Sequence, residues 1–397
     1  MASTDTTGRA RNRSGPFAGV LIADLTHALS GPFCTMLLAE LGARVVKIER
    51  PPGGDLARAF SPMVDGQSVF FTAVNRGKES IALDLDRHPD RELFVNLVRR
   101  ADVVVENFRP GTLEHHGCGY DALRAINPRI ILASISGFGC TGPDHWEGAY
   151  DTVIQAMSGL MSVTGFPDGP ATMVGDAIAD CLTGTFTFGA IGAALFARER
   201  TGAGTHIDIA MLDCLFSTLQ NGLAKYLGTG AIPQRIGNQL TLCAPFGAFR
   251  TKDGDLAICV ADQPAFVRLV TALEAPQLAS DTRFATNDAR LANLDALRAA
   301  LEAGLASRTA PQWVEILQHL TIPCGVVNTI AQAAEDPQTV ARNMVVRVGD
   351  MRAPGNPIKM STLDDPPERP LAPALDGDGP ALRRELADSG GKGRGHA

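Results

Sequence analysis

The sequence predicts an α/β fold: a large domain on a Rossmann-like, doubly wound parallel sheet, and a smaller α/β domain after it. Two observations predict the sheet. Short β-branched runs recur through residues 20–133, and stretches typical of helices lie between most of them. Strands that helices cover on both faces are continuously apolar rather than alternating, as these runs are. A third observation, the length of 397 residues, leaves room for two or three domains.

The predicted strands of the sheet are 20–23, 45–48, 81–83, 103–105 and 130–133, and the helices between them are 32–41, 89–100 and 120–126. Pro32 and Pro89 suit the first turn of a helix, because an N–H is not needed there. A small-residue helix over 181–200 follows Asp180, and Gly202 and Gly204 end it. A strand over 206–209 and a helix over 212–227 complete the large domain.

The rest of the chain predicts a linker, a small domain and a return to the first domain. Residues 228–245 are rich in Gly, Pro and Gln, so they predict a linker between a large domain at 16–227 and a small one at 246–329. The small domain contains a strand pair within 246–260 and helices over 264–274, 290–307 and 310–320. A return segment over 330–388 has a helix at 330–342 and irregular structure after 344. The polar leader, 1–15, and the tail, 389–397, predict disorder.

Composition excludes several classes of function. With 36 Lys and Arg against 43 Asp and Glu, the net charge is −7, which argues against nucleic-acid binding. Eight Cys without CxxC or paired spacing do not predict a disulfide framework, and no His/Cys cluster has zinc spacing, so we expect no metal site. The longest uncharged stretch, 181–197, is too short and too rich in Thr and Gly for a membrane span. We expect a cytoplasmic protein without a secretory signal.

A GxGxxG pattern at Gly137, Gly139 and Gly142 follows the fifth predicted strand. Pro143 and polar residues come next, so no helix begins where a pyrophosphate would need its N-terminus. The pattern therefore predicts a glycine loop that shapes a pocket rather than a dinucleotide site.

Basic residues collect at the ends of the predicted strands. Lys47 and Arg50 end the second strand, Arg76 and Lys78 precede the third, and Arg109 follows the fourth. In a chain of net negative charge, basic loops around a glycine-rich crevice suggest a polyanionic small ligand such as a nucleotide. The alternative is a set of solvated loop charges.

Asp180 stands directly before the small-residue helix, in GDAIADCLTG. Spacing alone favours a helix N-cap, because Asp at that position accepts a backbone N–H of the first turn. The same helix terminus also favours a charged carboxylate that is ready to act as nucleophile or base. Asp176, four residues earlier, is the rival candidate.

Several segments together resemble the class III CoA transferases, which include formyl-CoA and carnitine CoA-transferases. The resemblance runs from about Phe17 to Leu386. Its motifs are GVLIADLTHALSGPFCTMLLAELGARVVKIERPPGGD, FFTAVNRGKESIALDL, ADVVVENFRPGTLEHHG, NPRIILASISGFG, GDAIADCLTG, RERTGAGTHIDIAMLD and IPCGVVN.

The resemblance implies that Asp180 is the nucleophile, which reverses the preference for a cap. It would attack an acyl-CoA thioester to give a mixed anhydride and then an aspartyl-CoA thioester. CoA is then a substrate, and no permanent cofactor is needed. We also expect the backbone amides of Gly137 and Gly139 to stabilise the oxyanions that develop during these steps. The CoA-binding residues that carry over are Leu29, Ser30, Arg50, Leu83, Asp84, Asn107, Phe108, Arg109, His115 and Tyr150.

The resemblance also implies an interlocked homodimer with neither nucleic-acid nor membrane partners. Formyl-CoA transferases have a glycine-run loop that the shorter segment RIGNQLTLCAPF lacks, so we expect succinyl-CoA or a similar donor and a dicarboxylate acceptor such as succinate or glutarate. One alternative is an α-methylacyl-CoA racemase. Tyr150 stands where such enzymes have a His, and a neutral Tyr is a poor base near neutral pH. The other alternative is a non-catalytic CoA-binding homologue.

Overall fold

The computed structural model describes residues 14–387 and divides the chain into two compact units. The first takes in the chain up to Leu160, Val174–Gln220 and the chain from Pro337 onward; the second comprises Met161–Met173 and Asn221–Asp336. The second unit thus begins ahead of the predicted linker at 228–245. The predicted tail and all but two residues of the predicted leader lie outside the described residues.

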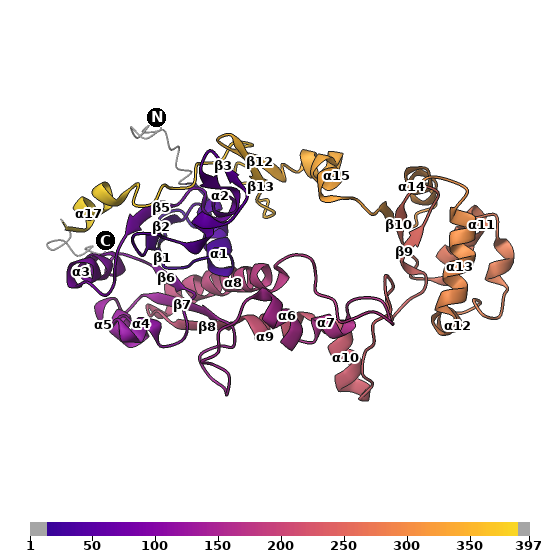
Figure 1. The fold of residues 1–397 in the computed structure, drawn as a ribbon, viewed down its shortest axis with the longest axis horizontal. Helices are drawn as coiled ribbons and strands as arrows, with labels where there is room; N and C mark the ends of the chain where they lie inside the picture. The colour runs from indigo at the N-terminus through magenta and orange to yellow at the C-terminus, as the bar shows by residue number, and fades with distance from the viewer. Residues whose placement is uncertain (1–13, 388–397) are drawn as a thin grey trace. The chain divides into compact units, whose positions relative to one another are not determined.

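A six-stranded sheet forms the centre of the first unit (Figure 1), and every pairing in it is parallel. Its order is β5 (Glu79–Ala82), β2 (Arg44–Glu49), β1 (Leu21–Asp24), β6 (Val103–Glu106), β7 (Ile131–Ser136) and β8 (His206–Ala210). In sequence rank this is 3-2-1-4-5-6, the doubly wound Rossmann order. The prediction of a Rossmann-like parallel sheet is confirmed. The order reverses between β1 and β6, where ligands bind at the carboxyl ends of strands.

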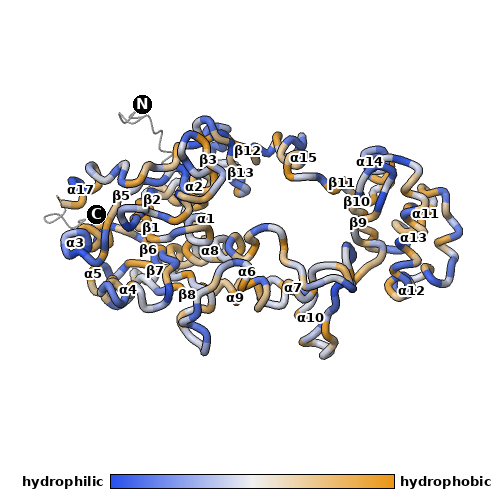
Figure 2. The backbone as a smooth tube through the Cα atoms, in the orientation of Figure 1, coloured by the Kyte–Doolittle hydropathy of each residue, from blue (hydrophilic) through white to orange (hydrophobic). Residues whose placement is uncertain are grey.

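Helices cover both faces of this sheet, because its strands are apolar on both sides. On one face α1 (Ser30–Glu40) and α8 (Ile178–Thr201) pack on residues such as Ile22 and Val103. On the other, α3 (His88–Val98), α5 (Tyr120–Ile126) and α17 (Gly379–Ala387) pack on residues such as Ala23 and Val104. Figure 2 shows the hydrophobic stretches of the tube along these central strands. Successive residues of one strand thus pack into the hydrophobic cores on opposite faces of the sheet.

The connections of the first unit carry short elements. They are η1 (Leu56–Ala59), β3 (Met63–Val64), β4 (Gln67–Ser68), α2 (Val69–Asn75), α4 (Thr112–His115), α6 (Asp151–Met157), α7 (Leu160–Val163, at the boundary), α9 (Met211–Thr218), α10 (Gln220–Thr229, at the boundary) and α16 (Pro337–Ala341). The helix predicted over 212–227 is two helices that break at Leu219. The prediction of irregular structure after 344 is wrong: β12 (Val345–Val348) and β13 (Met351–Pro354) form an antiparallel pair, and α17 follows.

The second unit has a three-stranded antiparallel sheet of β11 (Cys324–Val326), β10 (Asp255–Cys259) and β9 (Phe246–Arg250). Its helices are α11 (Gln263–Ala272), η2 (Pro276–Ala279), α12 (Asn287–Ala292), α13 (Leu294–Leu305), α14 (Ala310–His319) and α15 (Ile330–Glu335). Phe249, Phe266 and Trp313 fill its core. The single helices predicted over 290–307 and 330–342 are each interrupted, at Asn293 and Asp336.

Among the described residues one helix, α8, is long and apolar enough to cross a membrane. It packs on α1 and on strands β7 and β8 of the sheet. A core helix of a globular domain has the same length and composition.

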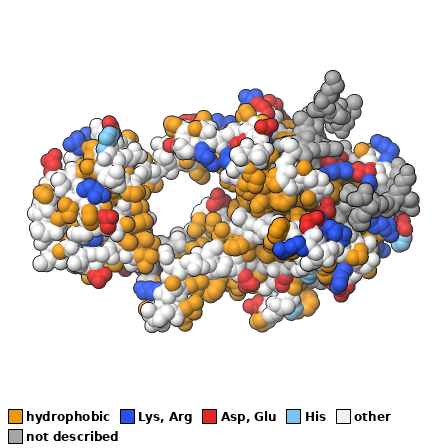
Figure 3. Space-filling view, turned by 180° about the vertical axis from the view of Figure 1, so that it is seen from behind, with side chains coloured by type: hydrophobic (Ala, Val, Ile, Leu, Met, Phe, Trp, Pro, Cys, Tyr) orange, Lys and Arg blue, Asp and Glu red, His pale blue; other side chains and the backbone are white. Residues whose placement is uncertain are grey.

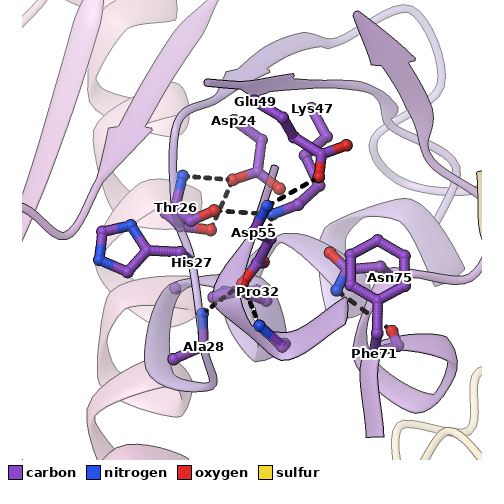
Figure 4. A network of polar contacts seen from close by, with 12 residues as sticks. Asp24, Thr26, His27, Ala28, Pro32, Lys47, Glu49, Asp55, Phe71 and Asn75 are labelled. Carbon is purple, nitrogen blue, oxygen red and sulfur yellow. Dashed lines mark hydrogen bonds and ion pairs between the residues drawn. The ribbon is translucent and has the colours of Figure 1, made fainter. Parts of the chain in front are cut away.

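A buried network of charges lies beneath the carboxyl ends of β1 and β2 (Figure 4). Lys78 Nζ lies 3.0 Å from Asp24 Oδ2, and Lys47 Nζ lies 2.9 Å from Asp55 Oδ2; all four side chains are fully buried. Lys47 also donates to the Thr26 carbonyl at 2.6 Å. Burial alone would raise the pKa of Asp24, but the two lysines and hydrogen bonds from threonines lower it to about 2. The network is therefore ionised and ties the loops after both strands together.

Helix α8 approaches α1 closely because it has a glycine at the contact. A Cβ on Gly184 would lie 2.6 Å from the carbonyl oxygen of Ser30 and 3.0 Å from the Phe33 ring. No Cβ fits against a backbone oxygen at that distance, so the contact requires glycine. The contact brings the first turns of the two helices together.

We expect Gly184→Ala to lower the free energy of unfolding by about 1–3 kcal/mol, because the added methyl group forces the two helices apart. Denaturant unfolding followed by circular dichroism measures this. The matched control is Gly189→Ala in the same helix, where a Cβ meets nothing within 4 Å; we expect it to gain about 1 kcal/mol from helix propensity. An equal loss in both variants would contradict the helix contact.

Candidate active site

Asp180 lies in the first turn of α8, where it is the third helical residue. The N-cap is Ala177, so the interpretation of Asp180 as a cap is wrong. The N–H groups of the first turn instead donate to the side chain of Asp151, the first residue of α6. Asp151 Oδ1 lies 2.7 Å from the Ala179 nitrogen and 3.4 Å from the Asp180 nitrogen. Asp176 is exposed and accepts the Ala177 N–H. The Asp180 carboxylate is thus free of the capping role.

The surroundings of Asp180 make its carboxylate more basic than usual. Burial and the negative charge of Asp151 raise its pKa to about 6, against hydrogen bonding from the side chain and backbone of Ser30, which lowers it. The neighbouring Cys181 thiol has a pKa raised to about 11, chiefly by burial, and so stays protonated near neutral pH. A carboxylate that is ionised at neutral pH but poorly solvated is suited to nucleophilic attack.

Asp151 was not predicted from the sequence. It follows Tyr150 in GAYD, and it meets α8 from 28 residues away, across a loop. Its Oδ2 accepts from the buried Gln155 amide at 2.6 Å. No local spacing pattern points to such a contact, so only the tertiary structure shows that the two aspartates are neighbours.

A pocket of about 320 Å³ opens at the carboxyl edge of the sheet, beside the switch point. It brings together four predicted CoA-binding residues, from the loops after three strands: Arg50, Leu83, Asp84 and Phe108. Arg50 is 73% exposed and lies 3.1 Å from Asp86. Asp55 also lines the pocket. A pocket lined by an exposed guanidinium suits a ligand that carries phosphates.

The loop after β1 is held by the loop after β6. Asn107 accepts the His27 N–H at 2.9 Å and donates to the His27 carbonyl at 2.8 Å. This pair of hydrogen bonds fixes the backbone just ahead of Leu29 and Ser30. Asn107, which the resemblance implies as a CoA-binding residue, therefore also holds the loop after β1 in place.

Six of the ten predicted CoA-binding residues lie outside the pocket lining: Leu29, Ser30, Asn107, Arg109, His115 and Tyr150. His115 is exposed, and its neighbour His116 lines the pocket instead and lies 3.2 Å from Asp86. Tyr150 is 76% exposed, directly before Asp151. Arg109 lies beside Gly148, where an added Cβ would meet its Nη2 at 2.8 Å.

The glycine loop after β7 packs tightly on the segment that leads to α6. A Cβ on Gly137 would lie 2.5 Å from the Ala149 Cβ. The Gly139 N–H donates to Ser136 Oγ at 2.9 Å, so that amide is engaged within its own loop. No helix begins between β7 and α6, as we expected of a loop that does not bind a pyrophosphate. None of the three glycines of the pattern lines the pocket beside the switch point.

Most of the basic residues that suggested a polyanion site have a structural role. Lys47 and Lys78 belong to the buried network, and Arg76 is buried 2.6 Å from Glu40. Only Arg50 and Arg109 remain available to a ligand. A larger cavity of about 1070 Å³, at the amino edge of the sheet, is lined by Arg76 but by none of the predicted site residues. Among residues 14–387 no group of three or more His, Cys, Asp or Glu is placed to hold a metal.

Comparisons with known proteins show the family of this chain. The model of CoA-transferase family III matches residues 17–379. Acetyl-CoA:oxalate CoA-transferase of Acetobacter aceti is 50% identical over 374 residues, which cover 94% of this chain and 96% of the relative. Succinyl-CoA:mesaconate CoA-transferase of Haloarcula hispanica is 40% identical and covers 96% of this chain and 98% of its own.

A solved structure has the same fold. The crystal structure of a CAIB/BAIF family protein from Brucella suis is 39% identical, with a TM-score of 0.85, and the match covers 94% of this chain and 100% of that one. The alternating strands and helices of this chain therefore form the fold of a known protein family. This chain belongs to CoA-transferase family III and is a CoA-transferase of class EC 2.8.3.-.

Proposed function

We propose that the chain transfers CoA from an acyl-CoA to a carboxylic acid through covalent intermediates on Asp180. The observation that carries the proposal is the Asp180 carboxylate in the first turn of α8, with a pKa raised to about 6 by burial and by Asp151. Acyl-CoA binds with its nucleotide in the pocket at the carboxyl edge, where Arg50 meets its phosphates.

In the first half-reaction an Asp180 oxygen attacks the thioester carbonyl, the C–S bond breaks and CoA thiolate leaves. The product is a mixed anhydride between Asp180 and the donor acid. The thiolate then attacks the aspartyl carbonyl, which releases the donor acid and leaves an aspartyl-CoA thioester. The acceptor carboxylate repeats these steps in reverse order, so that Asp180 is regenerated and the acceptor leaves as its CoA thioester. Covalent catalysis divides one difficult exchange into easier steps.

The acceptor that we propose is a dicarboxylic acid. Relatives are named for transfer to oxalate, mesaconate and glutarate, which are all dicarboxylates. The donors in those names are acetyl-CoA and succinyl-CoA. A panel that combines both donors with C2 to C5 diacids, read by mass spectrometry, identifies the donor and the acceptor.

We also propose that the chain works as an interlocked homodimer. Figure 3, which views the molecule from the side opposite to that of Figure 1, shows patches of exposed hydrophobic side chains. The exposed large apolar residues include Phe186, Phe196, Phe216, Tyr226, Leu227 and Ile232. So many exposed aromatic and aliphatic groups favour burial against a second copy of the chain.

We expect Asp180→Asn to lower kcat about a thousandfold or more, because the amide cannot form the anhydride. Acyl-CoA with hydroxylamine, followed by peptide mass spectrometry, should mark Asp180 in the natural enzyme and nothing in the variant. The matched control is Asp176→Asn, four residues earlier and exposed, which should keep its activity. Full activity in Asp180→Asn contradicts the transferase mechanism. Exchange of the α-proton of a 2-methylacyl-CoA by the natural enzyme, without transfer of CoA, also contradicts it.

The rate of Asp180 acylation should rise with pH through a midpoint of about 6, because only the carboxylate attacks. The ionised fraction grows from about a tenth at pH 5 to about nine-tenths at pH 7. Asp151→Asn removes the like charge that raises the pKa of Asp180, so the midpoint should move to lower pH. Single-turnover acylation with hydroxylamine trapping measures both profiles, and identical midpoints would rule out coupling between the two carboxylates.

Arg50→Gln should raise the KM for acyl-CoA about tenfold and leave kcat unchanged, because it removes a charged hydrogen bond to the ligand. Steady-state kinetics at low ionic strength measures the effect. The control is Arg347→Gln, an exposed arginine on β12 that pairs with Glu368. A rise in KM with both variants would indicate general attraction of the anion rather than a binding site.

A further inference from the structure

We propose that Asp55 is a positioning residue for the reaction: by holding the backbone of Ala28, it sets the loop that presents Ser30 to Asp180. The inference rests on the proposed function, since it takes Asp180 as the nucleophile. Asp55 comes from the loop after β2, in PPGGD, and reaches the loop after β1.

The Asp55 carboxylate is fully buried, and both of its oxygens have a distinct task. Oδ1 accepts the Ala28 N–H at 2.9 Å and the Ala57 N–H at 2.9 Å. Oδ2 lies 2.9 Å from Lys47 Nζ. Burial would raise the pKa of Asp55, but Lys47 and the hydrogen bonds from Ala28 and Ala57 outweigh it and lower the pKa. Asp55 is thus an ionised acceptor, and Figure 4 shows it within the network of polar contacts that includes Ala28 and Lys47.

Ala28 needs such an acceptor because its backbone is left-handed, with φ at 62°. This conformation is disfavoured for a residue with a Cβ, and glycine is the usual residue there. Asn107 holds the peptide groups of His27 on the preceding side. Two consecutive residues are therefore fixed by side chains from two other strand ends, which sets the direction in which the chain leaves Ala28.

Ser30 follows two residues later and opens α1. It is buried, and its carbonyl oxygen lies against α8 at Gly184, the helix that carries Asp180. Its hydroxyl and backbone amide lower the pKa of the Asp180 carboxylate. Gly184 lets α8 approach the Ser30 carbonyl. A turn at Ala28 that relaxes toward the right-handed region moves Ser30, while Asp55 itself contacts neither Ser30 nor Asp180 by any hydrogen bond or ion pair shown for residues 14–387. Asp55 acts through the loop.

The experiment compares Asp55→Asn with the natural enzyme in single-turnover acylation at saturating acyl-CoA. An Asn amide that turns its only acceptor oxygen toward Lys47 presents its NH2 group to the Ala28 N–H, so the hydrogen bond to Ala28 is lost. We expect the rate to fall about 10- to 100-fold, because the loop relaxes and a reacting group is displaced. The pH midpoint of acylation should move upward, because weaker hydrogen bonding from Ser30 raises the pKa of Asp180. Asp55 lines the CoA pocket, so the effect is read at saturation, where a loss of binding alone leaves the rate unchanged.

Ala28→Gly supplies the rescue. Glycine adopts a positive φ without help, so Ala28→Gly combined with Asp55→Asn should recover part of the lost rate. Asp55→Glu keeps the negative charge opposite Lys47, which the Asn variant removes. Its longer side chain does not place an oxygen where Oδ1 accepts the Ala28 N–H, so it should show the same fall in rate and the same upward shift of the midpoint. If Asp55→Asn does not fold, the Glu variant decides.

The matched control for a lost buried carboxylate is Glu40→Gln. Glu40 is buried between Arg76 and Arg369, at the amino edge of the sheet. Its variant should lose stability but keep both the acylation rate per folded enzyme and the pH midpoint. An equal fall in Glu40→Gln, or a folded Asp55 variant with unchanged rate and midpoint, overturns the positioning role. Absence of the hydroxylamine-trapped adduct in the natural enzyme would instead reject the proposed function.

Discussion

The structure depends on two buried lysines whose positive charges are balanced by carboxylates where the central strands end. Lys78 meets Asp24, and Lys47 meets Asp55, with none of the four side chains exposed. Removing one partner of such a pair leaves an uncompensated charge in the interior, at a cost of about 3–5 kcal/mol. The pairs therefore hold the loops after β1 and β2 in one arrangement. Those loops line the pocket that we propose for CoA, and the first of them leads to Ser30.

A second constraint follows from the first. Once the loop after β1 is fixed, α1 begins at Ser30, and the glycine at position 184 lets α8 pack against that point. Asp180, the proposed nucleophile, is carried on α8, so helix packing sets its place, while the loop after β1 sets the place of Ser30. Asp151 then supplies both the cap for α8 and a negative charge beside Asp180. One residue thus contributes to the stability of the helix and to the basicity of the nucleophile.

The charged residues show why spacing alone was ambiguous. Lys47, Arg50, Arg76, Lys78 and Arg109 stand at equivalent places in the sequence, at the ends of strands. The structure separates them: three are buried in ion pairs, and two remain at the surface. A buried lysine in this fold is possible only because carboxylates from other segments meet it, and a list of basic residues carries no information on where those carboxylates lie.

Local patterns in the sequence are enough to predict the sheet, its parallel sense and the position of Asp180 at the start of a long helix. Those features depend on local patterns, such as β-branched runs, helix-compatible stretches and the motifs shared with the family. The tertiary structure alone decided that Ala177 and not Asp180 is the N-cap, that Asp151 adjoins the nucleophile and that His116 lines the pocket beside the exposed His115. It also decided the breaks at Leu219 and Asn293. The physical reason is that each of these outcomes is set by contacts between segments far apart in the chain, whose free energy exceeds local preference.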